Sequence, residues 1–205
     1  MKPILEKFTS KKEGSELSKI YFADGYSYAS NQHIMVKAPG VVEGSIENDK
    51  FSDVFKTNMV AGEKVADLNL SDLKKFLDPF RTEPKYSKML CIDCDGDGTL
   101  ECDLGHDHEC EDCNGEGEVD DISKFIGMGF EKLFTIQLYS KLFNPHYLDQ
   151  LTDLSDYAEV FKVPGRLQYL FKMKEYDAVI MPKKDEILHL LPDSVEEYQP
   201  KTVQL

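Results

Sequence analysis

The segment from Cys91 to Asp121 constrains the fold more than any other part of this 205-residue chain. It contains all five cysteines and thirteen acidic residues, but no Lys or Arg. The formal net charge of the whole chain is −14, so the remaining sequence is nearly neutral, with 25 acidic and 24 basic residues. The segment has few large apolar side chains, and ordering its backbone costs about 1–2 kcal/mol per residue. We therefore expect a separate module that depends on a stabiliser other than a hydrophobic core.

Two copies of the motif C-x-x-C-x-G-x-G indicate what that stabiliser is. Cys91 and Cys94 begin one copy, and Cys110 and Cys113 begin the other. Two such pairs supply four thiolates for a tetrahedral zinc ion, and the glycines let the chain turn so that backbone amides point at the sulfurs. A structural zinc contributes on the order of 10–16 kcal/mol in small peptides. The spacing predicts one structural zinc with these four cysteines as its ligands.

Three other interpretations of this motif remain open. A pair of disulfides would require an oxidising compartment, to which nothing in the sequence points. A redox dithiol would be a single pair that opens a helix after a strand. Asp93, Asp95 and Asp97 followed by Gly98 imitate the start of a calcium-binding loop, but its twelfth position is Leu104 where a bidentate Glu is required.

The fifth cysteine lies near two histidines. Cys102, His106 and His108 could form a second metal site, although the spacing C-x3-H-x-H matches no common closed structural pattern. Alternatively, Cys102 is simply exposed, or is a nucleophile with His106 or His108 as its base.

The doubled motif resembles the cysteine-rich zinc region of the J-protein chaperones. The resemblance covers residues 91 to 117, with two repeats instead of the usual four, and it implies a zinc-binding pair of hairpins. The chain contains no His-Pro-Asp tripeptide, so the resemblance does not extend to co-chaperone activity.

The sequence on either side of the module predicts strands and helices. Alternating apolar residues and turn signals predict strands at 2–8, 133–139, 158–163, 167–173 and 176–182, and a hairpin at 20–35 that turns at Asp24-Gly25. Helices are expected at 71–80, with Ser71 as N-cap, and at 144–154, with Asn144 as N-cap and Pro145 in the first turn. This order predicts an α+β fold, an antiparallel sheet with helices on one face, interrupted by the zinc-binding hairpin module. The expected boundaries are 1–85 and 122–190 for the two parts of the body, 86–121 for the module and 191–205 for a C-terminal tail.

Four short motifs in the body are similar to the last domain of the bacterial DNA polymerase sliding clamp (beta subunit). They are Lys2-Pro3-Ile4-Leu5, Ala23-Asp24-Gly25-Tyr26, Phe143-Asn144-Pro145-His146-Tyr147-Leu148 and Val179-Ile180-Met181-Pro182. The resemblance spans roughly residues 2–38 and 133–184. It implies a clamp-like domain whose helices face duplex DNA, whose sheets join edge to edge with neighbouring copies, and which works with replication proteins. One such domain cannot encircle DNA, so the resemblance also implies a homo-oligomer or a partner.

The chain departs from that family at both ends. The family's first helix is missing at the N-terminus, and its closing Met-Pro-x-Arg-Leu is replaced by Met181-Pro182-Lys183-Lys184-Asp185, which about twenty residues follow. In clamps this end borders the groove that takes partner peptides, so the resemblance leaves that groove in doubt.

The charge distribution limits contact with DNA. Duplex binding depends on Lys and Arg that neutralise phosphates, and the candidates are Lys74, Lys75 and Arg81. The acidic module would repel phosphate over a screening length of about 8 Å, so DNA could bind only with the module directed away from it. An acidic module on a neutral body is also suited to a basic protein partner.

No catalytic motif occurs in the sequence, and a zinc ion with four thiolates has no open position for water. No apolar run approaches the roughly 18 residues of a membrane helix, and the first residues lack a signal-peptide core, so we expect a cytoplasmic protein without a membrane partner. The sequence therefore predicts a non-enzymatic, clamp-like DNA-replication accessory or protein-interaction domain with one structural zinc. The alternative is a zinc-ribbon adaptor that binds a basic protein partner and does not contact DNA.

Overall fold

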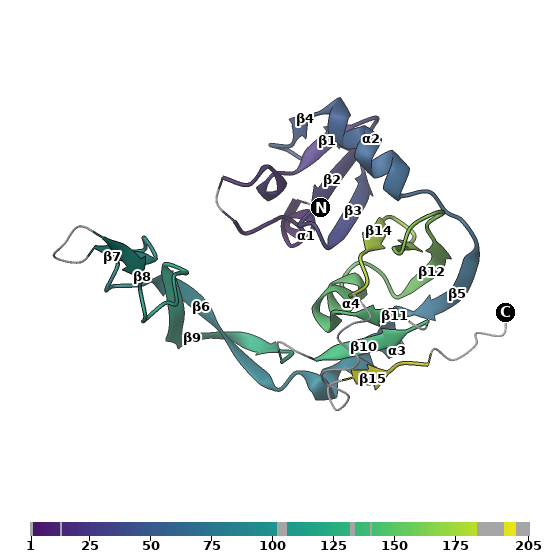
Figure 1. Ribbon diagram of the computed structural model, residues 1–205. Coiled ribbons are helices and arrows are strands. Elements are labelled where there is room, and N and C mark those ends of the chain that lie inside the picture. Colours follow the sequence, from purple (N-terminus) through teal and green to yellow (C-terminus); the bar gives the residue numbers. More distant parts are fainter. Residues whose placement is uncertain are drawn as a thin grey trace. The chain divides into compact units, whose positions relative to one another are not determined.

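The chain folds into two compact units. The computed structural model describes residues 2–12, 14–101, 106–131, 134–139, 141–183 and 195–199, apart from the side chains of 49–52 and 195. The first unit combines Met1–Pro79 with Lys132–Leu205, and the second is Phe80–Glu131 (Figure 1). The second unit extends beyond the expected module at 86–121, because it includes the whole of the two long strands that lead into and out of the cysteine motifs.

An eight-stranded sheet forms the centre of the first unit. Its strand order is β4-β1-β2-β3-β14-β13-β12-β5, and neighbours are antiparallel except for the parallel pair β1 and β4. The strands are β1 (Tyr21–Ala23), β2 (Tyr26–Ser30), β3 (Ile34–Pro39), β4 (Ile46–Glu47), β5 (Lys64–Asn69), β12 (Tyr157–Lys162), β13 (Tyr169–Lys172) and β14 (Asp177–Ile180). Segments from before and after the second unit meet twice, where β3 pairs with β14, with Val36 opposite Ala178, and where β5 pairs with β12.

One face of this sheet is the core of the first unit. The register aligns fully buried apolar side chains across five strands, namely Ala29, Val36, Ala178, Phe171 and Val160. Three helices contribute further fully buried leucines, such as Leu5, Leu73 and Leu148. The helices are α1 (Lys2–Glu6), α3 (Leu70–Leu77) and α4 (Pro145–Thr152).

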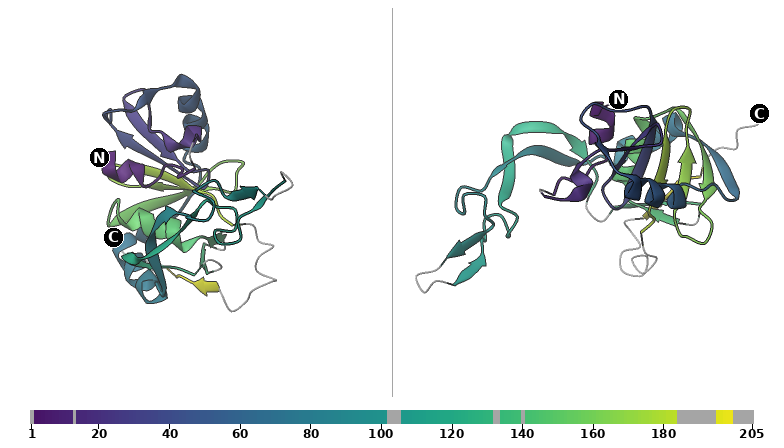
Figure 2. Two further views of the ribbon diagram at one scale, coloured as in Figure 1. Left: turned by 90° about the vertical axis from the view of Figure 1, so that its left-hand side faces the viewer. Right: turned by 90° about the horizontal axis from the view of Figure 1, so that it is seen from above.

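A helix that the sequence did not predict covers part of the other face. In α2 (Asp49–Asn58), the ring of Phe55 stacks on Tyr28 of β2 with the centroids 4.4 Å apart. The left view of Figure 2 shows α2, in blue, on the opposite side of the sheet from α1 and α4. The mixed α+β class is therefore confirmed, but the expectation that the helices lie on one face is wrong. With ten residues, α2 is the longest helix in the described part of the chain, and none there could cross a bilayer.

Two other local predictions are also wrong. Residues 2–8 begin as the helix α1 and not as a strand, because Leu5 and Phe8, three positions apart, both turn into the core. The N-terminus therefore has a helix, although the sequence was expected to lack one there. Helix α3 begins at Leu70 with Asn69 as its N-cap: the Asn69 side chain accepts a hydrogen bond from the Asp72 N–H at 3.0 Å.

The turns and caps at two other positions agree with the sequence. The hairpin of β1 and β2 turns at Asp24 and Gly25, whose φ angles of 53° and 81° are those of the turn that Asp-Gly favours. Helix α4 begins at Pro145, and the Asn144 side chain accepts a hydrogen bond from the His146 N–H at 3.0 Å. Both predictions are confirmed.

A three-stranded sheet completes the first unit. It consists of β10 (Thr135–Leu138), β11 (Lys141–Phe143) and β15 (Val195–Glu197), in the order β11-β10-β15. Two short 3-10 helices lie at Glu16–Ser18 and Asp78–Phe80. The segment expected to be a tail thus contributes β15, and Tyr198 after it is buried against Phe76, with ring centroids 4.9 Å apart.

Candidate metal centre

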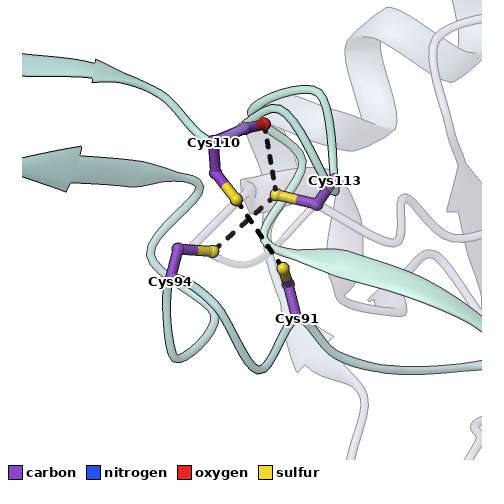
Figure 3. A group of neighbouring side chains, drawn as sticks. All are labelled: Cys91, Cys94, Cys110 and Cys113. Carbon is purple, nitrogen blue, oxygen red and sulfur yellow. Dashed lines mark hydrogen bonds between the residues drawn. The ribbon is translucent and has the colours of Figure 1, made fainter.

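Two pairs of strands hold the cysteine motifs in the second unit. The long strands β6 (Glu83–Leu90) and β9 (Glu118–Gly129) form an antiparallel ribbon, with Leu90 opposite Glu118 at its end. The short strands β7 (Thr99–Glu101) and β8 (Asp107–Glu109) form a second hairpin, with Thr99 opposite Glu109. Each C-x-x-C loop lies between the ribbon and this hairpin, so the two loops face each other (Figures 1 and 3).

The two loops repeat one backbone geometry. In the first loop the Gly96 N–H donates to the Cys91 carbonyl, and in the second the Gly115 N–H donates to the Cys110 carbonyl, both at 3.1 Å. In each loop the amide of the last glycine also donates to the second sulfur at 3.2 Å. These bonds run from Gly98 to Cys94 and from Gly117 to Cys113. The repeat in the sequence is thus a repeat in three dimensions.

The four sulfurs converge between the loops. All four Sγ atoms lie within 4.8 Å of one another, and the cysteines are 1–6% exposed. Figure 3 shows the sulfurs directed toward a common centre. The Cys91–Cys110 and Cys94–Cys113 Sγ distances are 3.8 and 3.7 Å. Zinc–sulfur bonds of about 2.3 Å in a tetrahedron place neighbouring sulfurs about 3.8 Å apart, whereas a disulfide requires about 2.05 Å. The cysteines are free of disulfides, and together they could hold a metal ion.

The four thiols cannot all ionise at such short separations without a cation. Burial raises the pKa of Cys91. The pKa of Cys110 also rises, to about 12: the Cys113 amide acts to lower it, but burial and the neighbouring thiols outweigh that amide. Burial acts in the same direction on Cys94, but the amides of Gly98 and Gly96 outweigh it and lower its pKa to about 7. A divalent ion at the centre would remove this conflict, because each ligand could then be a thiolate.

Two glycines bring the loops together. Gly98 and Gly117 have φ angles of +76° and +74°. A Cβ on Gly98 would clash with the Gly115 carbonyl, and one on Gly117 would clash with the Gly96 carbonyl. Each loop therefore needs glycine at this position both for its backbone conformation and for the approach of the other loop.

Little besides the sulfurs fills the interior around the cysteine cluster. The partly buried apolar side chains that pack against the cysteine cluster are Leu100 and Val119. Two residues of this size cannot offset the entropy of ordering the loops. A metal ion would therefore be the main source of stability in this part of the chain.

The other metal sites considered from the sequence are not assembled among the described residues. Cys102 lies outside them, while His106 and His108 are exposed. In the described part of the chain, the four cysteines are the one group of three or more potential ligands that comes together. The calcium interpretation finds no support either, because Asp93, Asp95 and Asp97 do not come together as a group of potential ligands in the described part of the chain.

The three candidate DNA contacts are divided between the two units. In the first unit, Lys74 Nζ lies 3.4 Å from a carboxylate oxygen of Asp153, and Lys75 Nζ lies 3.3 Å from Asp72. Arg81 belongs to the second unit, where its guanidinium lies over the Phe130 ring at 5.4 Å. The ion pair between Asp153 and Lys74 was not predicted. The sequence did place Asp153 at the end of a predicted helix, where it caps α4 in the structure.

Comparison with known proteins gives only distant structural neighbours. No protein-family model matches the chain, and no curated protein matches it. The neighbours are sliding clamps. The DNA polymerase beta subunit of Streptococcus pyogenes is 14% identical with a TM-score of 0.44, and the match covers 88% of this chain and 62% of that one. The DnaN sliding clamp of Bartonella birtlesii is 12% identical with a TM-score of 0.46, over the same shares of the two chains. The chain thus spans less than two thirds of the length of these proteins.

Proposed function

We propose that this chain is a non-enzymatic accessory or protein-interaction domain that carries one structural zinc ion. The observation that supports this most directly is the convergence of Cys91, Cys94, Cys110 and Cys113, whose sulfur separations fit tetrahedral zinc. Four thiolate ligands leave no coordination position for water or substrate, so the zinc would stabilise the module and not catalyse a reaction. A reducing cytoplasm would keep the thiols available for the metal.

The metal proposal is tested on protein purified without chelator. Elemental analysis should give one zinc per chain, and cobalt substitution should give the absorption of a tetrahedral thiolate site. Cys113→Ser should lose both signals, whereas Cys102→Ser, which removes the cysteine outside the proposed site, should retain both. Metal-free wild-type protein, or equal metal content in the two variants, would overturn the proposal.

The link to DNA replication is supported by the four clamp-like motifs of the sequence. In this proposal the first unit is a clamp-like body that works beside duplex DNA as an oligomer or with a replication partner. Lys74 and Lys75 are the proposed contacts of the body, and Arg81 that of the second unit. If the body acts as an oligomer, light scattering should detect an assembly larger than one chain. In either case duplex binding should weaken steeply with salt and again in Lys74→Glu and Lys75→Glu.

A specific observation favours a second candidate, an adaptor that binds a basic protein and never meets DNA. Lys74 and Lys75 are already paired with carboxylates, which reduces the positive potential of α3. The second unit carries fifteen acidic and four basic residues, a net charge of −11. No duplex binding at about 50 mM salt, where screening is weaker than at physiological salt, would favour the adaptor over the clamp-like accessory.

A further inference from the structure

The ribbon of β6 and β9 carries large apolar side chains on its outside. Six of them, on the ribbon or just beyond the end of β6, are 45–80% exposed: Leu90, Ile92, Ile122, Phe125, Ile126 and Met128. We call this set the apolar ribbon. Single exposed hydrophobics are ordinary, but six large ones gathered on one two-stranded ribbon and its end indicate an interaction surface.

The backbone of the ribbon is also open to a partner. Within the described residues β6 and β9 pair only with each other, so each has one edge without a neighbouring strand. Such edges are usually short or protected, yet β9 has twelve residues. The register passes from Tyr86 opposite Phe125 to Ser87 opposite Asp121, which leaves three residues of β9 in a bulge that includes Ile122. Bulges of this kind redirect side chains and often lie at functional sites.

The charges beside the apolar ribbon indicate what could cover it. The module at its end is strongly acidic, and the cations of the ribbon are already paired: Lys88 Nζ lies 3.1 Å from Asp120 and Lys124 Nζ lies 3.0 Å from Asp121. A second copy of the chain would bring a net charge of −14, of which −11 lies in its own second unit, and a nucleic acid would bring phosphates, so both would be repelled. A partner with complementary charge must be basic.

We propose that the apolar ribbon is the docking site for a basic, amphipathic segment of another protein. The apolar side of that segment would cover Ile122, Phe125 and Ile126, while its Lys and Arg side chains would lie beside the acidic loops. This inference rests on the proposed interaction function and assigns it a surface and a class of partner. The apolar contact gives the site its affinity, and the charges select the partner and accelerate association.

Synthetic peptides of about 18 residues provide the test. The first peptide is amphipathic, with Leu on one side and Lys on the other. The second has the same composition in scrambled order, and the third has Glu in place of each Lys of the first. Fluorescence anisotropy with the zinc-loaded full chain should show binding of the patterned basic peptide, at least tenfold weaker binding of the scrambled one, and none of the acidic one. Hydrogen exchange should show protection at residues 84–92 and 118–129 when the patterned peptide binds.

Matched variants locate the site. The double variant Ile122→Ser/Ile126→Ser should weaken the patterned peptide at least tenfold, because it removes apolar side chains that are exposed and contribute little to folding. Leu167→Ser changes an equally exposed leucine of the first unit and should leave the affinity unchanged. The inference would be overturned if the two variants had equal effects or if the chain preferred the acidic peptide. It would also be overturned if the chain self-associated in a way that requires the two isoleucines.

The outcome is separable from that of the metal proposal, because zinc content is measured on the same samples. Stoichiometric zinc without peptide binding would refute the docking site alone. Absence of zinc from the wild-type protein would refute the metal centre whatever the peptide does.

Discussion

Replacing Gly98 by alanine should disrupt the metal centre far more than the same change at Gly115. Both glycines have a φ angle of +76°, so each substitution incurs the same left-handed backbone penalty of about 1–2 kcal/mol. They differ in what the new methyl group meets. At Gly115 it meets the flexible Glu109 side chain, whose Cγ lies 3.3 Å away. At Gly98 it clashes with the Gly115 carbonyl of the opposite loop, well inside the 3.0 Å that real Cβ contacts keep.

The magnitude follows from how far the loops must separate. An ordinary carbon–oxygen contact is about 3.3 Å, so the loops must move apart by roughly 1 Å. The Gly98 amide donates to the Cys94 sulfur, so this movement displaces a ligand, whereas metal–ligand distances tolerate only about 0.2 Å. We expect Gly98→Ala to bind zinc at least about 100-fold more weakly than Gly115→Ala, a difference of about 2.8 kcal/mol.

Competition with a chromophoric chelator measures both zinc affinities under one set of conditions. Circular dichroism and the melting of the first unit serve as controls, since neither substitution touches that unit. Equal zinc affinities of the two variants would refute the argument that close approach of the loops, and not backbone conformation alone, requires Gly98.

Other predictions concern both units. Removing zinc with a strong chelator should abolish hydrogen-exchange protection in residues 83–129 but leave that of the eight-stranded sheet, whose core contains no cysteine; parallel loss in both units would contradict this. Phe55→Ala should destabilise the first unit by about 3–5 kcal/mol in urea denaturation, because it removes the fully buried side chain that anchors α2. As a control, Val54→Ala changes a half-exposed side chain and should alter stability by less than about 0.5 kcal/mol. Burial acts to raise the Asp153 pKa, but hydrogen bonds and charges from Lys7 and Lys74 hold it below its ordinary 3.8. Asp153→Asn should therefore cost about 0.5–1 kcal/mol at pH 7, and the difference from wild type should vanish as the pH falls through that lowered pKa; a constant difference would show that the ion pairs are not its cause.

The four cysteines could be grouped from the sequence because metal chelation is encoded locally. Two cysteines separated by two residues already lie in one turn, and the following glycines mark where the chain reverses direction. Only the pairing of the two loops depends on the rest of the fold. The caps of the helices were less certain. Asn69 and Ser71 are both good N-caps. Asn69 is the cap, and α3 begins at Leu70, because β5 ends at Asn69, which pairs with Tyr157 of β12.

The long ribbon could not be predicted for a different reason. Sequence patterns detect an element by the side that it buries, and β6 and β9 bury almost none of their large apolar residues. Helix α2, by contrast, has a helical period that was not used: Phe51, Val54 and Phe55 follow the i, i+3, i+4 spacing of a helix, and Phe55 is fully buried. The N-terminal residues were predicted as a strand because the three-residue spacing of Leu5 and Phe8 is too short a pattern to distinguish helix from strand.

The same lack of a buried face makes the apolar ribbon dependent on the metal. The end of β6 enters the first loop through the Cys91 N–H, which donates to the Gly117 carbonyl at 2.8 Å, directly beside the start of β9. That junction fixes the register of the ribbon at its end, and a two-stranded ribbon without a core is barely stable by itself. Loss of the metal would release the junction and with it the alignment of Ile122 and Phe125, while the first unit would stay folded. Zinc occupancy would therefore control binding at this surface, although neither the zinc ion nor its cysteine ligands would contact the partner.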